Sequence, residues 1–569
     1  MWELLLFVIG VSCTDIVGTI GTANKTTNDH NNSRSLQNNG VIEAEDSKNV
    51  VDTEYGSVRG YENNGVLQFF DIPYGRFSAE EPFQNPSKPV SWATIRENTE
   101  HTSRCPQINT ENAYIGTIEC LTLSVFKPQS AESSGVLFHI HDSNFRNGSG
   151  DPQKYIPKNL VSKDLIVVLP NYRLGPLGFL CLQNSTAPGN AGLKDLSLAL
   201  KWTFDNIKNF GGNASNIVVS GSGAAGAIVE YLLLYNDSKN FISKAIVESG
   251  FTLSPWALDR NPLRTADKLV DKLRTADSSI SSQKMYSSIE QTDIEALIKA
   301  AKDIDFRPCI ESEAGFLNHS PWALLENQKL KIPYMSGSAN EAAMEEAFQQ
   351  TEESLSHLNL NTYLLLPSDL KFDNDEERNK VGNQVKNQYF GDNNITMDNR
   401  KQLSQCLSDS KYVYPGIRGA RLLIKGGSTV FFYEFSYSRD EALRAGRGVF
   451  ISLVFSKVDT TNEGTSYTEN ENSMTTKITN MWVNFIKNGN PSTDAIVWNN
   501  MTAGEEEWLS IGNEFNMQKG FHADRMKLWN NIYEKHFVEH NIGLELKPSA
   551  YITLASLIFL IDFRIKCLI

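Results

Sequence analysis

The sequence predicts an α/β protein built around a largely parallel sheet. Three short runs are typical of strands, at residues 135–141, 164–170 and 241–249, and the run at 164–170 is continuously apolar, as in a buried strand. A fourth run begins at Ile217 and passes through a cluster of tiny residues into an apolar helix that continues to Leu234. Between these runs, residues 193–209 carry apolar side chains at helical spacing. Strands that alternate with helices along a chain are typical of parallel sheets.

The flanking regions complete one domain, which we place at residues 49–540. Residues 51–60 alternate around turn residues like a short hairpin, and residues 120–126 alternate like a strand. After residue 260 the pattern favours helices at 264–274, 289–302 and 375–389, a strand at 429–435, and final helices at 478–487 and 524–536. The last two helices carry Trp482 and Trp529, which we interpret as core residues. No internal repeat or strong linker divides the region.

Composition excludes one class of partner. The chain has 569 residues, a net charge of −14 and an isoelectric point near 5.3. Binding to nucleic-acid phosphates requires a basic surface, so a nucleic-acid partner is not expected.

The N-terminus indicates an extracellular protein. Residues 1–13 are apolar with small residues at their end, as in a secretory signal peptide, although no Lys or Arg precedes the apolar run. Residues 14–48 are rich in Asn, Thr and Ser, and we expect a disordered polar arm. Nine triplets match the N-glycosylation pattern, at Asn24, Asn31, Asn147, Asn184, Asn213, Asn236, Asn318, Asn394 and Asn500. Together these features predict a secreted glycoprotein.

The cysteines and the C-terminus leave alternatives open. Of seven cysteines, Cys105 and Cys120 are close enough to close a small loop in an oxidising compartment, whereas spacing alone assigns no partners to the others. The tail at residues 541–569 contains an apolar run of 12 residues at 550–561, shorter than the roughly 20 residues that span a membrane. It is compatible with a lipid-anchor (GPI) signal, a short membrane anchor or a plain secreted tail.

Several long motifs resemble the type-B carboxylesterase and cholinesterase family. The resemblance extends over nearly all of residues 50–535, and the particular matches include residues 103–107, 171–180, 187–195, 199–213, 254–258 and 488–491. The resemblance implies an α/β-hydrolase fold, with a mostly parallel central sheet, helices on both faces and a deep gorge. It also implies a Cys105–Cys120 disulfide. The expected location is secreted or at the extracellular face of the plasma membrane.

The first catalytic device of that family is altered at the nucleophile. The family pattern G-E-S-A-G falls on residues 221–225 and places Gly223 where the serine belongs. A glycine carries no group that attacks a carbonyl. A slip of one residue would promote Ser222, but the strand before and the helix after keep the family spacing. We therefore expect the Ser222 side chain to point elsewhere.

The base, the oxyanion hole and the acid differ as well. The best register places Arg447 at the catalytic histidine, and a guanidinium stays protonated near neutral pH. The family sequence H-G-G-G-F, whose glycine N–H groups bind the oxyanion, reads His141-Asp142-Ser143-Asn144-Phe145 here. Only the acid has a candidate, at Glu341, which without a histidine has no catalytic task and is otherwise a surface or ion-paired glutamate.

These differences predict a protein without esterase activity. The leading interpretation is a cholinesterase-like glycoprotein that binds a protein partner, as in the neuroligin, neurotactin, gliotactin and glutactin group. One alternative is an extracellular binding protein for a small apolar ligand in the residual gorge. Another is a residual hydrolase that uses Ser222. No cofactor or metal is expected. A homodimer through the two late helices would follow the family's habit, and the C-terminus offers a route to membrane anchoring.

Overall fold

The computed structural model describes residues 49–276, 286–311, 315–438, 446–455 and 469–539. The predicted signal peptide, the polar arm with Asn24 and Asn31, and the C-terminal tail lie outside the described residues. Among the described residues, no helix is long and apolar enough to cross a membrane.

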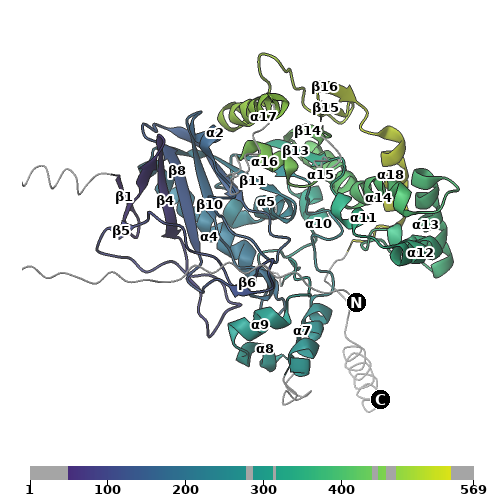
Figure 1. The fold of residues 1–569 in the computed structure, drawn as a ribbon, viewed down its shortest axis with the longest axis horizontal. Helices are drawn as coiled ribbons and strands as arrows, with labels where there is room; N and C mark the ends of the chain where they lie inside the picture. Colours follow the sequence, from purple (N-terminus) through teal and green to yellow (C-terminus); the bar gives the residue numbers. More distant parts are fainter. Residues whose placement is uncertain (1–48, 277–285, 312–314, 439–445, 456–468, 540–569) are drawn as a thin grey trace, which may run out of the picture. The chain divides into compact units, whose positions relative to one another are not determined.

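The strands form a large mixed sheet and smaller pairings (Figure 1). They are β1 (Val50–Thr53), β2 (Gly56–Arg59), β3 (Tyr61–Asn63), β4 (Val66–Pro73), β5 (Arg96–Glu97), β6 (Gln107–Ile108), β7 (Tyr114–Ile115), β8 (Thr122–Pro128), β9 (Ser134–Ile140), β10 (Leu165–Pro170), β11 (Gly212–Ser222), β12 (Lys244–Glu248), β13 (Pro333–Ala339), β14 (Thr429–Phe435), β15 (Glu507–Ile511) and β16 (Phe515–Lys519).

The α-helices follow the same numbering (Figure 1). They are α2 (Lys158–Val161), α3 (Gly175–Phe179), α4 (Ala191–Asn206), α5 (Ala224–Leu234), α6 (Asn236–Lys239), α7 (Pro262–Ala276), α8 (Ser287–Gln291), α9 (Ile294–Ala300), α10 (Pro321–Asn327), α11 (Met344–Phe348), α12 (Glu352–Leu360), α13 (Asp375–Phe390), α14 (Arg400–Ser408), α15 (Tyr414–Gly426), α16 (Val449–Val454), α17 (Glu469–Asn488) and α18 (Ala523–His536). The 3₁₀-helices are η1 (Ile207–Phe210), η3 (Thr362–Leu365) and η4 (Met397–Asn399), and η5 (Asp409–Val413) is a π-helix.

The large sheet has 11 strands in the order β16-β15-β14-β13-β12-β11-β9-β10-β8-β4-β3. From β15 to β10 in this order, every neighbouring pair is parallel, and antiparallel strands complete both edges. The side chains of β9, β10 and the second half of β11 are buried throughout. This is the pattern expected of parallel strands covered on both faces, and it confirms the predicted α/β class.

Helices cover both faces of the sheet. Figure 1 shows α2 and α17 on one side and α4 and α5 on the other. Helix α5 follows β11 directly and is buried along its whole length, because it packs against β11 and β12. Its apolar sequence therefore serves the core rather than a solvent face.

Most expected segments correspond to an element, with a few differences. The helix predicted at 289–302 is interrupted, because Asp293 caps the start of α9 by accepting a hydrogen bond from the Ala296 N–H. The helix predicted at 193–209 ends at Asn206 and continues as η1. Strands β13, β15 and β16 had not been predicted, and β13 contains small and polar residues rather than a β-branched run.

Two disulfides are present among the described residues. Cys105 pairs with Cys120, and Cys181 pairs with Cys309 across 128 residues of sequence. Cys406 is buried and free. The second bridge had no signal in the spacing of the cysteines.

Candidate functional site

The carboxyl ends of β9, β11 and β12 meet at one edge of the sheet. Gly221 of β11 lies opposite Ile140 of β9, and Ser222 lies opposite Glu248 of β12. Strand β9 has β10 on one side and β11 on the other, so the chain reverses its direction of winding here. Ligands of open α/β sheets bind in the crevice outside such a reversal point.

The turn after β11 keeps the geometry of a nucleophile elbow. Gly223 has φ 60° and ψ −127°, a conformation that side-chain-bearing residues rarely adopt, and α5 begins at the next residue. The corner is also crowded, because a Cβ atom added to Gly250 would lie 1.8 Å from the carbonyl oxygen of Gly223. The strained corner that presents a serine in a hydrolase is thus intact, with glycine at its apex.

The Asp142 carboxylate fills the space above Gly223. A Cβ atom added to Gly223 would lie 2.7 Å from Oδ2 of Asp142 and 2.9 Å from its Oδ1. The same carboxylate accepts a hydrogen bond from the Ala224 N–H at 3.1 Å and from the Asn144 N–H at 3.4 Å. These two N–H groups belong to the residue after the elbow and to the loop after β9, the positions that supply an oxyanion hole. The Asp142 carboxylate therefore fills the nucleophile position. It also accepts the hydrogen bonds of the N–H groups that would bind an oxyanion.

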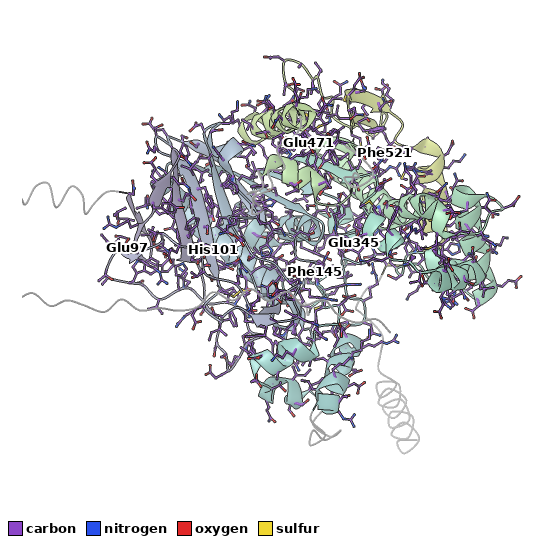
Figure 2. All side chains as sticks on the ribbon, in the orientation of Figure 1. Glu97, His101, Phe145, Glu345, Glu471 and Phe521 are labelled. Carbon is purple, nitrogen blue, oxygen red and sulfur yellow. A yellow bond between two sulfur atoms is a disulfide. The ribbon has the colours of Figure 1, made fainter. Side chains whose placement is uncertain are left out.

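The loop after β9 keeps a conformation suited to glycine. Asn144 and Phe145 have φ values of 47° and 61°, and residues with side chains in that region are strained. The loop is held by a hydrogen bond of 2.7 Å between the hydroxyls of Ser143 and Tyr172, and by the Phe145 N–H, which donates to Ser143 Oγ at 3.0 Å. Phe145, labelled in Figure 2, lies in the body of the domain. Its ring packs edge-on against Phe179. These contacts hold the loop in its strained form.

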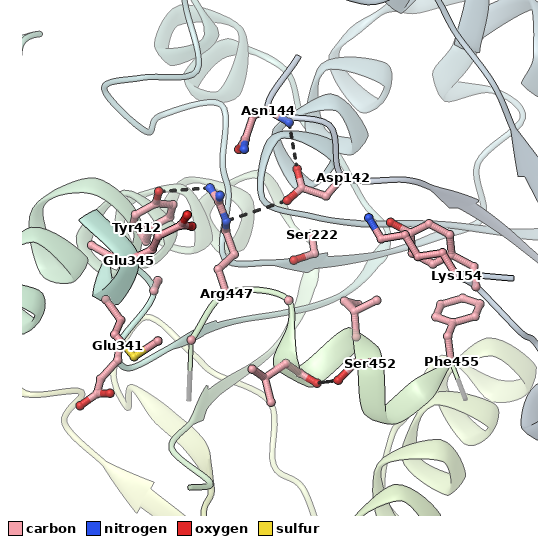
Figure 3. A pocket seen from close by; sticks show the side chains of 18 of the residues that line it. Asp142, Asn144, Lys154, Ser222, Glu341, Glu345, Tyr412, Arg447, Ser452 and Phe455 are labelled. Atoms are coloured by element: carbon pink, nitrogen blue, oxygen red, sulfur yellow. Dashed lines mark hydrogen bonds and ion pairs between the residues drawn. The ribbon is translucent and has the colours of Figure 1, made fainter. Parts of the chain in front are cut away.

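Arg447 reaches the same place from the turn before α16. Its Nε atom is 3.9 Å from Oδ2 of Asp142, and its Nη1 donates to the Tyr412 hydroxyl at 3.3 Å (Figure 3). Burial disfavours the charge on Arg447, but the nearby Asp142 carboxylate, with smaller contributions from Tyr412, Glu248 and Glu345, outweighs burial and raises the pKa of Arg447 from its ordinary value. The guanidinium is therefore always charged here and accepts no proton.

Ser222 engages a buried carboxylate. Its hydroxyl donates to Glu248, and the Ser249 hydroxyl donates to the other oxygen of the same carboxylate. Glu248 is buried, and burial raises its pKa to about 7, opposed by the two serine hydrogen bonds and by Arg447. Ser222 is 4% exposed and has a carboxylate, not an imidazole, as its partner.

Glu341 follows β13 at the same edge of the sheet. It lines the cavity described below, but Figure 3 shows its carboxylate turned away from Arg447. Oxygen Oε2 of Glu341 is buried and has no hydrogen-bond partner among the described residues. The acid candidate is therefore not connected to the position of the base.

The three histidines nearest to these elements take other roles. Nδ1 of His139 is hydrogen-bonded to Ser220 Oγ at 2.9 Å, and burial lowers the pKa of this imidazole to about 3. His141 stacks on Tyr172, and burial lowers its pKa to about 3 as well. His522 pairs with Glu434 at 2.5 Å. In this arrangement none of the three is hydrogen-bonded to a serine at the elbow.

A cavity of about 940 Å³ opens over this site. Its size is typical of small-molecule sites, but much of its wall is charged. The charged lining residues are Asp142, Asp151, Lys154, Glu341, Glu345, Glu346 and Arg447, and the aromatic ones include Tyr155, Tyr412 and Phe455. Within the part of the chain that the structure describes, no group of three potential ligand side chains could hold a metal ion.

The predicted glycosylation asparagines lie at or near the surface where they are described. Asn184, Asn236, Asn318, Asn394 and Asn500 are exposed, and Asn147 and Asn213 are half-buried. Their positions are compatible with modification, which stays a prediction.

The sheet, the elbow and the cavity above it define the α/β-hydrolase class of protein. A model of the carboxylesterase family matches residues 47–529, and the chain belongs to this family. The solved structure of PNB esterase has a TM-score of 0.71 and 24% sequence identity, and the match covers 84% of this chain and 99% of that one. That structure supports the fold.

Curated relatives fall into two kinds. Venom carboxylesterase-6 of Apis mellifera is 26% identical over 539 residues, which cover 86% of this chain and 93% of that protein. Esterase FE4 of Myzus persicae is 28% identical, over 81% of this chain and 86% of that one. Neuroligin-2 of Mus musculus is 25% identical over 581 residues, 87% of this chain and 68% of that protein. Overall similarity therefore does not separate proteins named as esterases from neuroligin-2.

The structure brings together Asp142, Asn144, Gly223 and Arg447, and leaves Ser143 and Glu341 aside. Sequence reasoning missed Glu248, whose carboxylate lies beneath the elbow. The only available signal was its place at the end of a strand, directly before Ser249 and Gly250. It also missed Tyr412, which comes from the distant η5 and carries no motif.

Proposed function

We propose that this chain is a non-catalytic carboxylesterase-family glycoprotein of the cell exterior that recognises a protein partner. The observation that carries the proposal is the position of Asp142. Its carboxylate fills the space above Gly223 and uses the Ala224 N–H that an ester substrate's oxyanion would need. The negative charge of Asp142 at this position would repel the negative charge that develops on the carbonyl oxygen of an ester during hydrolysis.

The chemical cost of these changes is large. Loss of nucleophile and base as a unit lowers turnover by about 10⁶-fold in a serine hydrolase. Loss of oxyanion donors lowers it by a further factor on the order of 10²–10³. Because all three changes meet at one point, no single compensating side chain restores the reaction.

The partner assignment rests on the setting of the protein. A predicted signal peptide, nine predicted glycosylation sites and two disulfides are typical of extracellular proteins. Neuroligin-2 is among the relatives that match along most of this chain. A homodimer and attachment to the membrane through the C-terminal tail complete the proposal.

The first test is covalent labelling of the purified glycoprotein with a fluorophosphonate probe, beside an active esterase. We expect no adduct on the chain and full labelling of the control. The Ser222→Ala variant is the matched control, because it shows whether any labelling depends on the Ser222 hydroxyl. An adduct that maps to Ser222 and disappears in this variant would overturn the non-catalytic assignment.

The second test addresses recognition. A tagged, secreted form of the chain, applied to a panel of cell lines that display surface proteins, should bind at least one line saturably. Protease treatment of those cells should abolish the binding, because the proposed partner is a protein. Binding to no line of the panel, or binding that resists the protease, would contradict this part of the proposal.

A further inference from the structure

We propose that a hollow beside Asn147 seats the first N-acetylglucosamine of a glycan that this asparagine carries. The hollow shares no lining residue with the cavity over the elbow. It lies between the loop after β9, strand β6 and helix α9, and its volume is about 220 Å³. The inference rests on the extracellular setting of the proposed function, and it assigns a ligand to a pocket that the proposed function leaves unused.

The hollow is a gap in otherwise dense packing. Gly175 is buried and lines it, yet a Cβ atom added to this glycine would meet no heavy atom of the described residues within 4 Å. Buried positions are normally close-packed on every side. The volume exceeds the roughly 30 Å³ that one water occupies, and it is smaller than the sites of drug-sized ligands, about 300–1,000 Å³. It suits a group of the size of one monosaccharide.

The lining has the two kinds of surface that a sugar ring contacts. Ile298 of α9 and Ala301 at its end are buried and form apolar wall. Asn112, Lys302 and Asp303 line the same hollow and are exposed, so the wall becomes polar towards solvent. A sugar has apolar C–H faces and polar hydroxyl edges, and a site with apolar walls and a few polar groups matches both.

Asn147 places the attachment atom at the wall of the hollow. Its side chain is half-buried and lines the hollow, and its Nδ2 donates to the carbonyl oxygen of Ile108 at 3.5 Å. An amide nitrogen carries two hydrogens and attachment replaces one, so this hydrogen bond survives the modification. The backbone here is fixed, because the Asn147 N–H donates to the Ser143 carbonyl at 3.0 Å and the Gly148 N–H to Gln107 Oε1 at 2.7 Å.

The modification uses an oligosaccharide linked to a lipid pyrophosphate as its donor. A bond forms between Nδ2 of Asn147 and C1 of the first N-acetylglucosamine, and the bond from C1 to the pyrophosphate oxygen breaks. Nδ2 releases one proton, and the lipid pyrophosphate leaves with the bonding electron pair, without oxidation or reduction. Ser149 completes the acceptor triplet but is only 9% exposed in the folded chain, so the transfer precedes the folding of this loop.

A seated sugar would join two parts of the domain that are distant in sequence. The loop after β9 carries Asp142 and the strained residues Asn144 and Phe145, and α9 lies on the other side of the hollow. Filling the hollow adds contacts to both walls, so it should lower the frequency of local opening there. Asn394 provides the contrast, because it is exposed and lies outside the lining of the hollow.

The first test measures the release of glycans from the native chain. The chain is secreted by cells that make N-glycans and treated with peptide N-glycosidase F, which cleaves the bond between asparagine and the first sugar. Release at Asn147 should be at least about tenfold slower than at Asn394, since the enzyme reaches a seated sugar only after local opening. Mass spectrometry follows each site, and both should be released completely after denaturation. Equal native rates would overturn the inference.

The variant Ala301→Leu separates a seated sugar from a merely half-buried asparagine. The longer side chain takes up part of the hollow, so native release at Asn147 should accelerate about tenfold towards the rate at Asn394. Release at Asn394 should stay unchanged, which shows that the domain is folded. Release at Asn147 that stays slow in this variant would refute the seat.

Hydrogen exchange then measures what the sugar does to its surroundings. Ser149→Ala and Asn147→Gln both abolish the acceptor triplet, and peptides from residues 294–304 should exchange about tenfold faster in each. Asn394→Gln, the matched loss of an exposed glycan, should leave these peptides unchanged. An endoglycosidase that leaves one N-acetylglucosamine on each asparagine should also leave their exchange slow. Fast exchange after this trimming would contradict the assignment to the first sugar.

The glycan map separates failure of this inference from failure of the proposed function. A secreted chain that carries sugar at other sites but none at Asn147 would refute the inference and leave the proposed function standing. A chain without sugar at any site would refute both, because the proposed function is that of a glycoprotein.

Discussion

Two Arg–Asp pairs in this domain differ in almost every physical respect. Arg173 and Asp195 are fully buried and joined by bonds of 2.8 Å and 2.6 Å from Nε and Nη2. The remaining Arg173 donor, Nη1, is satisfied by the carbonyls of Pro82 and Gln84. Arg447 and Asp142, by contrast, are 20% and 28% exposed and separated by 3.9 Å.

The difference shows which residues specify the fold and which specify chemistry. Arg173 and Asp195 belong to two of the long motifs that carry the family resemblance, and they join the start of α4 to the loop after β10. Arg447 and Asp142 stand where the family places catalytic groups. The Arg173–Asp195 pair matches the family motifs and holds two parts of the fold together. The Arg447–Asp142 pair differs from the family's catalytic residues and lies at the wall of a cavity.

The largest expected effect tests the buried pair. Arg173→Met should lower the free energy of unfolding by about 3–5 kcal/mol, because it leaves the Asp195 carboxylate buried and unpaired. Arg447→Met should cost much less, about 1 kcal/mol, since Asp142 keeps two N–H donors and access to water. Denaturant unfolding followed by fluorescence measures both. Equal losses would erase the distinction between the two pairs.

The next effect concerns pH and Glu248. Its folded-state pKa, about 7, lies above the value of 4.5 that an unperturbed glutamate has in the unfolded chain. The folded state therefore holds the extra proton between these values, and its stability falls as pH rises from about 4.5 to about 7. The full loss, reached above pH 7, is about 3 kcal/mol.

Glu248→Gln should remove this pH dependence. Relative to the native chain, the variant should gain stability as pH is raised from 4.5 to 8, because glutamine cannot ionise. Unfolding curves across that range give the result, with exposed Glu352→Gln as the control for loss of one charge. A difference between Glu248→Gln and the native chain that does not change with pH would contradict the raised pKa.

Much of the fold was readable from local pattern. A continuous apolar run predicted β10, an alternating pattern predicted β9, and helical spacing at 193–209 predicted α4. Burial of a strand or of one helix face fixes where apolar residues recur in the sequence, so these elements can be predicted locally. The sequence did not predict β13, because its small and polar residues have low β-propensity. The strand forms through its pairing with the neighbouring strands β12 and β14.

The sequence predicted only part of the site, because the rest depends on tertiary packing. The sequence placed Gly223, Arg447 and Asp142 in one site because each falls in a motif that resembles a catalytic motif of the family. It did not reveal that Asp142 would turn its carboxylate over the elbow, since side-chain direction depends on the left-handed backbone at Asn144 and Phe145. Long-range partners such as Tyr412 and Glu248, and the Cys181–Cys309 bridge, depend on tertiary packing that no local window contains.

The last prediction depends on a small coupling energy and tests directly whether Asp142 fills the elbow. Gly223→Ala should destabilise the chain through left-handed backbone strain, about 1–3 kcal/mol, and through the contact of 2.7 Å between the new Cβ and Asp142 Oδ2. Gly391, at φ 58° and ψ −136° with open space around its Cβ position, is a matched site for the strain alone. Gly223→Ala should therefore cost more than Gly391→Ala.

A double-mutant cycle isolates the contact from the strain. In an Asp142→Gly background, Gly223→Ala should cost only as much as Gly391→Ala, which gives a coupling energy of about 1–2 kcal/mol between positions 142 and 223. The same background should leave the Gly391→Ala cost unchanged, because the two sites share no contact. Strict additivity of Asp142→Gly and Gly223→Ala would mean that the carboxylate does not occupy the nucleophile's place, and the central argument for a non-catalytic elbow would then rest on the missing serine alone.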